Sequence, residues 1–123
     1  MKKIFLIILL IIPINAFSFE KTTNFTFEKF ENAKKNQKTI VVNSWNKNCR
    51  TCKTQSKIFA NAVEDFKDIE FFFYEQKKYD NIAKALGISF WTTIVVYKGE
   101  TEIARKIGLV KKQDIYNLIK KGI

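Results

Sequence analysis

The two cysteines of this 123-residue chain, Cys49 and Cys52, lie where a strand-like segment meets a helix-like one. The apolar run 39–44 precedes them, and apolar residues recur at helical spacing over 50–66. Backbone N–H groups and the dipole at the start of a helix favour a thiolate. The pattern is typical of a dithiol that exchanges with disulfides.

Other uses of a cysteine pair explain this spacing poorly. A disulfide across two intervening residues closes a very short loop, so it constrains the unfolded chain little. A structural zinc site usually has four ligands, and the sequence contains no histidine and no third cysteine. We therefore expect neither a purely structural disulfide nor a zinc site, and no resident cofactor or metal.

The N-terminal residues 1–18 have the pattern of a secretory signal peptide. A positively charged start is followed by an unbroken apolar run over 4–12, and small residues precede the expected cleavage after Ser18. This run is shorter than the roughly 20 residues that a spanning helix needs, so an uncleaved membrane anchor is the secondary interpretation. The expected mature protein, 19–123, is a single domain exported to an oxidising compartment such as a bacterial periplasm.

The formal net charge of +10 does not by itself indicate a nucleic-acid partner. Of the 22 basic residues, only Arg50 and Arg105 are arginines. Arginine is the side chain preferred for bidentate contacts with phosphates and base edges. The lysines are spread along the whole chain without a cluster, so we expect solvated lysines and no binding of nucleic acid.

Apolar spacing and turn residues predict four helices and four strands after the N-terminal segment. Thr26 is suited to cap the first helix and Gly87 to end the third. Strands separated by helices are expected to pair in parallel, and the last two strands to form an antiparallel hairpin. The order predicts an α/β fold, a three-layer sandwich whose mixed sheet has helices on both faces. The predicted helices are 27–35, 50–66, 80–86 and 112–121, and the predicted strands are 39–44, 69–74, 93–97 and 102–107.

With Cys-x-x-Cys after the first long strand, this order of elements resembles the thioredoxin family over about 25–123. Trp45 matches the tryptophan that packs beneath the active site in thioredoxins, and Lys53 matches the basic residue that commonly follows the second cysteine. The segment 87–100 resembles the family's strand and hairpin, and 105–108 resembles its following strand and glycine. The resemblance implies a small exported thioredoxin-like protein.

The resemblance implies a thiol–disulfide oxidoreductase that acts on protein disulfides. Nothing in the sequence requires more than a monomer, which is the state we expect. Cys49 is expected to be the attacking thiolate, and Cys52 to resolve the mixed disulfide. Positive charge on Lys47, Arg50 and Lys53 is expected to lower the pKa of the Cys49 thiol.

The direction of electron flow depends partly on the two residues between the cysteines. Arg50 and Thr51 match neither the Gly-Pro pair of general reductants nor the Pro-His pair of strong oxidants. Small exported members without an inserted helical domain more often resemble reductases supplied by a membrane electron donor. We therefore expect a reductase.

Three positions depart from the family pattern. Thr92 stands where thioredoxins carry a cis-proline, and a cis bond before a non-proline residue costs about 3–4 kcal/mol, so the Trp91–Thr92 bond is expected to be trans. Asn43 stands where they place a buried aspartate, and Asn48 where they usually have an exposed tryptophan. The polar Asn48 removes an apolar docking surface.

These departures change what the site can do. The Thr92 hydroxyl is expected to donate a hydrogen bond to the Cys49 thiolate. The amide of Asn43 cannot accept the proton of Cys52, which leaves water, a more distant group or the substrate as acceptor; the alternative is that Asn43 only satisfies buried polar groups. For Trp91, contact with substrate and a place in the core are both open.

Two other functions use the same residues. Two exposed thiolates could bind a soft ion such as Cu(I), which would make the protein a metal carrier or a helper in metal-centre assembly. Against it, the sequence has no histidine and a single methionine, Met1, to complete such a site. A third function is a redox-inactive binding domain, which the presence of both cysteines disfavours.

Overall fold

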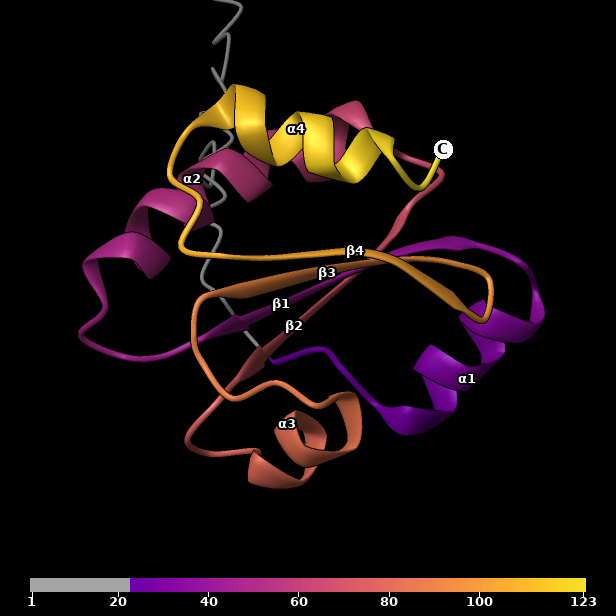
Figure 1. Cartoon of the computed structure of the whole chain (residues 1–123), viewed down its shortest axis with the longest axis horizontal. Helices are drawn as coiled ribbons and strands as arrows, with labels where there is room; N and C mark the ends of the chain where they lie inside the picture. Colours follow the sequence, from indigo (N-terminus) through magenta and orange to yellow (C-terminus); the bar gives the residue numbers. More distant parts are fainter. Residues whose placement is uncertain (1–22) are drawn as a thin grey trace, which may run out of the picture.

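The computed structural model describes residues 23–123, and the expected signal peptide lies outside that range. Every helix and strand begins and ends within one residue of its predicted bounds. No helix in the described part is both long enough and apolar enough to cross a membrane. The elements (Figure 1) are α1 (Phe27–Lys35), β1 (Thr39–Trp45), α2 (Arg50–Asp65), β2 (Glu70–Glu75), α3 (Asp80–Leu86), β3 (Thr93–Lys98), β4 (Thr101–Ile107) and α4 (Lys112–Lys120).

The ends of the helices follow from local side chains. The Thr26 hydroxyl accepts a hydrogen bond from the Lys29 backbone N–H, at 3.1 Å, and so caps α1 as predicted. Gly87 ends α3 with φ at +64°, a left-handed conformation that glycine adopts without steric cost.

The sheet has the strand order β2-β1-β3-β4. β1 and β2 are parallel, as predicted, and β3 and β4 form the predicted antiparallel hairpin. The prediction that helix-separated strands pair in parallel is wrong for β3, which runs antiparallel to β1 with Asn43 opposite Ile94. The seven residues of α3 span only about 10 Å. β2 therefore ends, and β3 begins, at the same end of the sheet, and the short α3 connects them.

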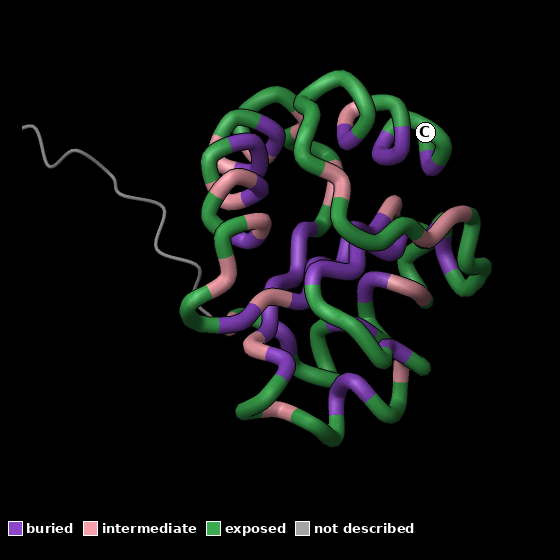
Figure 2. Tube along the Cα trace, turned by 60° about the vertical axis from the view of Figure 1, so that its left-hand side comes forward, coloured by how far each residue is buried: buried purple, intermediate pink, exposed green. Residues whose placement is uncertain are grey.

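Helices cover both faces of the sheet, α1 and α3 on one and α2 and α4 on the other (Figure 1), which confirms the three-layer sandwich. Alternate residues of β1 point to opposite faces: Ile40 and Val42 pack with α1 and α3, and Val41 packs with α2 and α4. Figure 2 shows the buried stretches running through the centre of the molecule. The end of β1 and the start of α2 are thereby fixed on a rigid core.

Candidate active site

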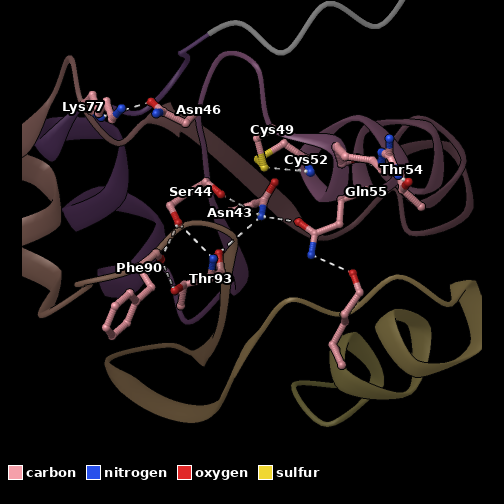
Figure 3. Close-up of a disulfide and its surroundings, with 12 residues drawn as sticks. Asn43, Ser44, Asn46, Cys49, Cys52, Thr54, Gln55, Lys77, Phe90 and Thr93 are labelled. Atoms are coloured by element: carbon pink, nitrogen blue, oxygen red, sulfur yellow. Dashed lines mark hydrogen bonds between the residues drawn. A yellow bond between two sulfur atoms is a disulfide. The ribbon is translucent and has the colours of Figure 1, made fainter.

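Cys49 and Cys52 form a disulfide at the first turn of α2 (Figure 3), with 5.2 Å between their Cα atoms. Cys49 is the N-cap, and its Sγ accepts a hydrogen bond from the Cys52 backbone N–H at 3.2 Å. Cys49 is partly exposed, whereas Cys52 is 3% exposed, as expected one turn inside the helix. Cys49 is therefore the more accessible residue of the pair.

Hydrogen bonds between buried side-chain amides connect β1, α2 and the segment after β4, next to the disulfide (Figure 3). The side-chain nitrogen of Asn43 donates to Gln55 Oε1 at 3.1 Å and to the Thr93 carbonyl at 3.3 Å. Gln55 Nε2 donates to the Leu109 carbonyl at 2.8 Å. Both amide side chains are fully buried. Asn43 thus satisfies buried polar groups, one of the two roles that the sequence left open.

Sequence reasoning missed Gln55. Its signal was available, because Gln55 lies on the buried stripe of α2 between Cys52 and Phe59, where the other positions are apolar. A polar side chain on such a stripe requires a buried partner. That partner, the carbonyl of Leu109, comes from a distant loop.

Hydrogen bonds of hydroxyl groups hold the loop before β3 against β1 (Figure 3). Ser44 Oγ donates to the Phe90 carbonyl at 3.3 Å and accepts the Thr93 backbone N–H at 3.0 Å. The Thr93 hydroxyl donates to the same Phe90 carbonyl. Ser44, which the sequence did not single out, therefore positions the loop beside the disulfide.

The Trp91–Thr92 peptide bond in this loop is cis, so the prediction of a trans bond is wrong. That prediction considered the dipeptide alone, whereas the folded loop is held on both sides. The Thr92 carbonyl accepts the Gly108 backbone N–H at 2.9 Å, in addition to the contacts of the preceding and following residues with β1. The backbone path is thus set by β1 and by the end of β4.

Thr92 and Trp91 have different environments. Thr92 is 2% exposed, and its hydroxyl has no hydrogen-bond partner among residues 23–123 in this disulfide form. Trp91 is 39% exposed, and the ammonium of Lys77 lies 5.1 Å from a ring centroid of its indole. Trp91 is therefore a surface residue beside the site and not part of the core.

A groove of about 640 Å³ runs beside the disulfide, and both cysteines and Trp45 line it. The indole N–H of Trp45 is buried and has no partner in the described part of the chain. Asn48, in the turn before Cys49, has φ at +60°, a left-handed conformation that asparagine tolerates better than most residues. Its exposed polar side chain forms part of the groove wall.

The residues around the cysteines carry positive charge. The first turn of α2 contains Arg50 and Lys53 and no acidic side chain, and both cations are exposed. Thr51 is partly buried between them. Among residues 23–123 there is no group of three or more His, Cys, Asp or Glu side chains that could hold a metal ion.

Comparison with known proteins agrees with this geometry. The family model for thioredoxin matches residues 20–121 of the chain. The thioredoxin of Mycoplasma genitalium is 34% identical over 91 residues, which cover 74% of this chain and 86% of that protein.

Solved structures share the fold. Trxlp from Edwardsiella tarda superimposes with a TM-score of 0.74 at 16% identity, covering 77% of this chain and 94% of that one. Mitochondrial thioredoxin 3 from Saccharomyces cerevisiae, in its oxidized form, has a TM-score of 0.72 at 22% identity and covers 84% and 97%. These structures show the fold, whereas the family match and the relative from Mycoplasma genitalium show the family: the chain belongs to the thioredoxin family of thiol–disulfide oxidoreductases.

Proposed function

We propose that the protein is an exported, monomeric reductase of protein disulfides that uses Cys49 and Cys52 as its redox pair. The observation that carries this proposal is the unequal exposure of the two cysteine residues. Cys49 caps α2 and reaches solvent, whereas Cys52 is 3% exposed. A substrate disulfide can meet Cys49 first, with Cys52 held one helical turn away to complete the exchange.

In the reduced protein, the Cys49 thiolate attacks one sulfur of the substrate disulfide. A Cys49–substrate bond forms, and the other substrate sulfur leaves as a thiolate that takes a proton from water. Cys52, once deprotonated, attacks Cys49 Sγ, the Cys49–substrate bond breaks, and the second substrate sulfur leaves as a thiolate that then takes up a proton. Two electrons pass from the protein dithiol to the substrate, which becomes two thiols.

The residues around the pair support this sequence of steps. The Cys52 backbone N–H, 3.2 Å from Cys49 Sγ, donates a stronger hydrogen bond to a thiolate than to a disulfide sulfur. Nearby, the buried amide of Asn43 offers no carboxylate to accept the Cys52 proton. That proton therefore goes to water or to the departing substrate thiolate.

Two further parts of the proposal concern location and electron supply. The pattern of residues 1–18 supports export to the periplasm. Residues 23–123 form one sandwich with no helical domain inserted between its elements, as in the small exported members that more often resemble reductases. A reductase in an oxidising compartment needs a continuous supply of electrons, and a membrane donor would provide it.

The reduction potential of the Cys49–Cys52 couple tests the direction of exchange. The purified protein is equilibrated in glutathione buffers, and the fraction oxidised is read at each ratio. A value near that of reducing thioredoxins, roughly −270 mV, is expected, whereas roughly −180 mV or above would indicate an oxidase or isomerase. A pair that forms no reversible disulfide would contradict the redox function and favour Cu(I) handling or simple binding.

Export is tested by the mass of the protein recovered from the cells that produce it. Cleavage after Ser18 leaves 19–123 in the soluble exported fraction. Recovery of the uncleaved chain in membranes would instead indicate an N-terminal anchor.

A further inference from the structure

The groove beside the disulfide brings together three lysines from two parts of the chain. Lys47 lies in the turn after β1, and Lys53 and Lys57 lie one turn apart on the same side of α2. Among the described residues, no aspartate or glutamate lines the groove. Three positively charged side chains thus line the groove that borders the two cysteines.

The three ammonium groups are not neutralised by the protein itself. All three lysines are exposed, and none forms an ion pair with any residue in 23–123. Lys53 and Lys57 are also spaced i,i+4, where like charges repel each other. In contrast, ion pairs with i,i+3 or i,i+4 spacing form elsewhere, on α1, α3 and β4. The groove thus retains positive charge that an acidic partner could neutralise.

A fourth lysine extends the positive rim towards the loop before β3. The Lys77 backbone N–H donates to Oδ1 of Asn46, a residue of the groove lining, at 3.4 Å (Figure 3). The Lys77 ammonium lies over the Trp91 indole. Trp91 and its neighbour Phe90, 39% and 62% exposed, form an apolar area beside this rim that a polypeptide could cover.

We propose that this groove binds the acidic flank of a protein disulfide, that is, aspartate or glutamate residues within a few positions of the cysteine that Cys49 attacks. The inference rests on the proposed function, since the bound segment is part of the substrate. An extended chain advances about 3.3–3.6 Å per residue, so nearby carboxylates reach the rim while the disulfide meets Cys49.

Lysine, and not arginine, supplies the charge of this groove. Lysine ammonium groups are point charges on flexible stems and do not impose the bidentate geometry of arginine. Their methylene stems, with Trp45, also give the groove apolar walls. The groove therefore selects acidic character over an exact sequence, chiefly by raising the rate of encounter.

Three disulfide-linked peptides of equal length test this selection. One carries Asp and Glu beside its cysteine, one carries Asn and Gln, and one carries Lys. The reduced protein is mixed with each peptide, and the second-order rate constant of reduction is measured. Each value is divided by that for dithiothreitol, which also attacks as a thiolate but has no groove, and this removes the effect of the flanks on attack by any thiolate.

We expect the acidic peptide to be reduced about tenfold faster than the neutral one at low salt, and the basic peptide to be slowest. The preference is expected to fall towards one at about 0.5 M salt, because screening weakens exposed charge pairs. Glutathione disulfide, which also carries carboxylates, is a separate arm of the test. Reduction of glutathione disulfide faster than the acidic peptide would overturn the assignment to a protein segment.

The triple variant K47Q/K53Q/K57Q localises the effect, and K29Q/K67Q/K98Q removes the same charge from exposed lysines outside the groove. The readout is the acidic-to-neutral rate ratio, which cancels any general change in the reactivity of Cys49. The ratio is expected to fall to about one in the first variant and to stay near the wild-type value in the second.

Several outcomes would overturn the proposal. Equal rates for the three peptides with the wild-type protein would show that the groove does not select acidic flanks, and would leave the proposed function intact. An equal loss of the ratio in both triple variants would assign the preference to overall charge. Failure to reduce any of the peptides would instead contradict the proposed function on which the inference rests.

Discussion

The two faces of the sheet bury different chemistry. Under α1 and α3, aromatic rings pack edge to face, with centroids 5.6 Å apart for Phe25 and Phe72 and 5.3 Å apart for Phe30 and Tyr97. Under α2 and α4, the apolar core gives way, next to the disulfide, to the buried amides of the Asn43–Gln55 chain. Aromatic rings also pack under α2, as for Phe59 and Phe73 at 5.4 Å, but only this second face also has buried polar groups next to the sulfurs. A change confined to the first face should therefore alter stability without altering the redox chemistry.

Replacing either cysteine is expected to have the largest effect on activity while leaving the fold intact. Cys49→Ala should reduce the rate of disulfide exchange to the uncatalysed background, because the attacking sulfur is lost. Cys52→Ala should retain attack and trap mixed disulfides, which non-reducing gels of cell extracts can detect. Both variants should stay folded, since the disulfide closes a short loop and the aromatic face is untouched. Turnover by Cys49→Ala would show that Cys52 can attack substrate directly.

The converse change lies on the aromatic face. Phe72 is 4% exposed and packs against Phe25 and Phe30, so Phe72→Ala should lower the free energy of unfolding by about 3–5 kcal/mol. Denaturant unfolding of the oxidised protein measures this loss, and Phe72→Leu should lose less. The reduction potential should stay the same in both variants. A change of more than about 30 mV, equivalent to roughly 1.4 kcal/mol, would show that the two faces are energetically coupled.

High pH should weaken the same face. Burial, and then the negative charge of Glu102, raise the pKa of Tyr97 from 10.0 to about 12. Above pH 10 the unfolded chain loses the tyrosine proton first, so the stability from this group is full below pH 10 and falls as pH rises towards 12. The loss should reach about 2–3 kcal/mol. Tyr97→Phe should lack this part of the pH dependence in denaturant unfolding at pH 9 to 12, and identical slopes for the two proteins would contradict the expectation.

A smaller effect is expected from the amide chain. Gln55→Ala leaves the Leu109 carbonyl and the Asn43 amide without one of their partners, which should cost about 1–3 kcal/mol of unfolding free energy. Asn61→Ala, at an exposed position of the same helix, should stay within about 0.5 kcal/mol of wild type. An equal loss of unfolding free energy in the two variants would show that the buried amide hydrogen bonds contribute no more to stability than an exposed side chain does.

What the sequence could predict follows from the range of the interactions. The helix and strand bounds depend on apolar spacing and on caps such as Thr26, which act within a few residues. The cis peptide before Thr92 and the direction of β3 depend on contacts between distant segments, such as Ser44 with Thr93. No local pattern contains those contacts.

The same distinction applies to the site. The Cys-x-x-Cys pair was readable because its chemistry depends on a short motif at the start of a helix. The sequence also placed Lys47 and Lys53 near Cys49, but it did not predict the groove, which forms only when the turn after β1 packs beside α2. Gln55 is an intermediate case. The sequence shows a polar side chain on an apolar stripe of the helix, but it does not show which distant group the side chain binds.

The smallest expected effect concerns Thr92, a buried polar residue in the loop beside the disulfide. Its hydroxyl is buried without a hydrogen-bond partner among residues 23–123 in the disulfide form, so Thr92→Val should stabilise the oxidised protein by up to about 1 kcal/mol. If the same hydroxyl donates to the Cys49 thiolate after reduction, the variant should also raise the pKa of that thiol, measured from thiolate absorbance against pH. A stabilised oxidised form with an unchanged thiol pKa would assign Thr92 to packing alone. A raised pKa would mean that the unpaired hydroxyl of the oxidised state is held in place for the reduced one.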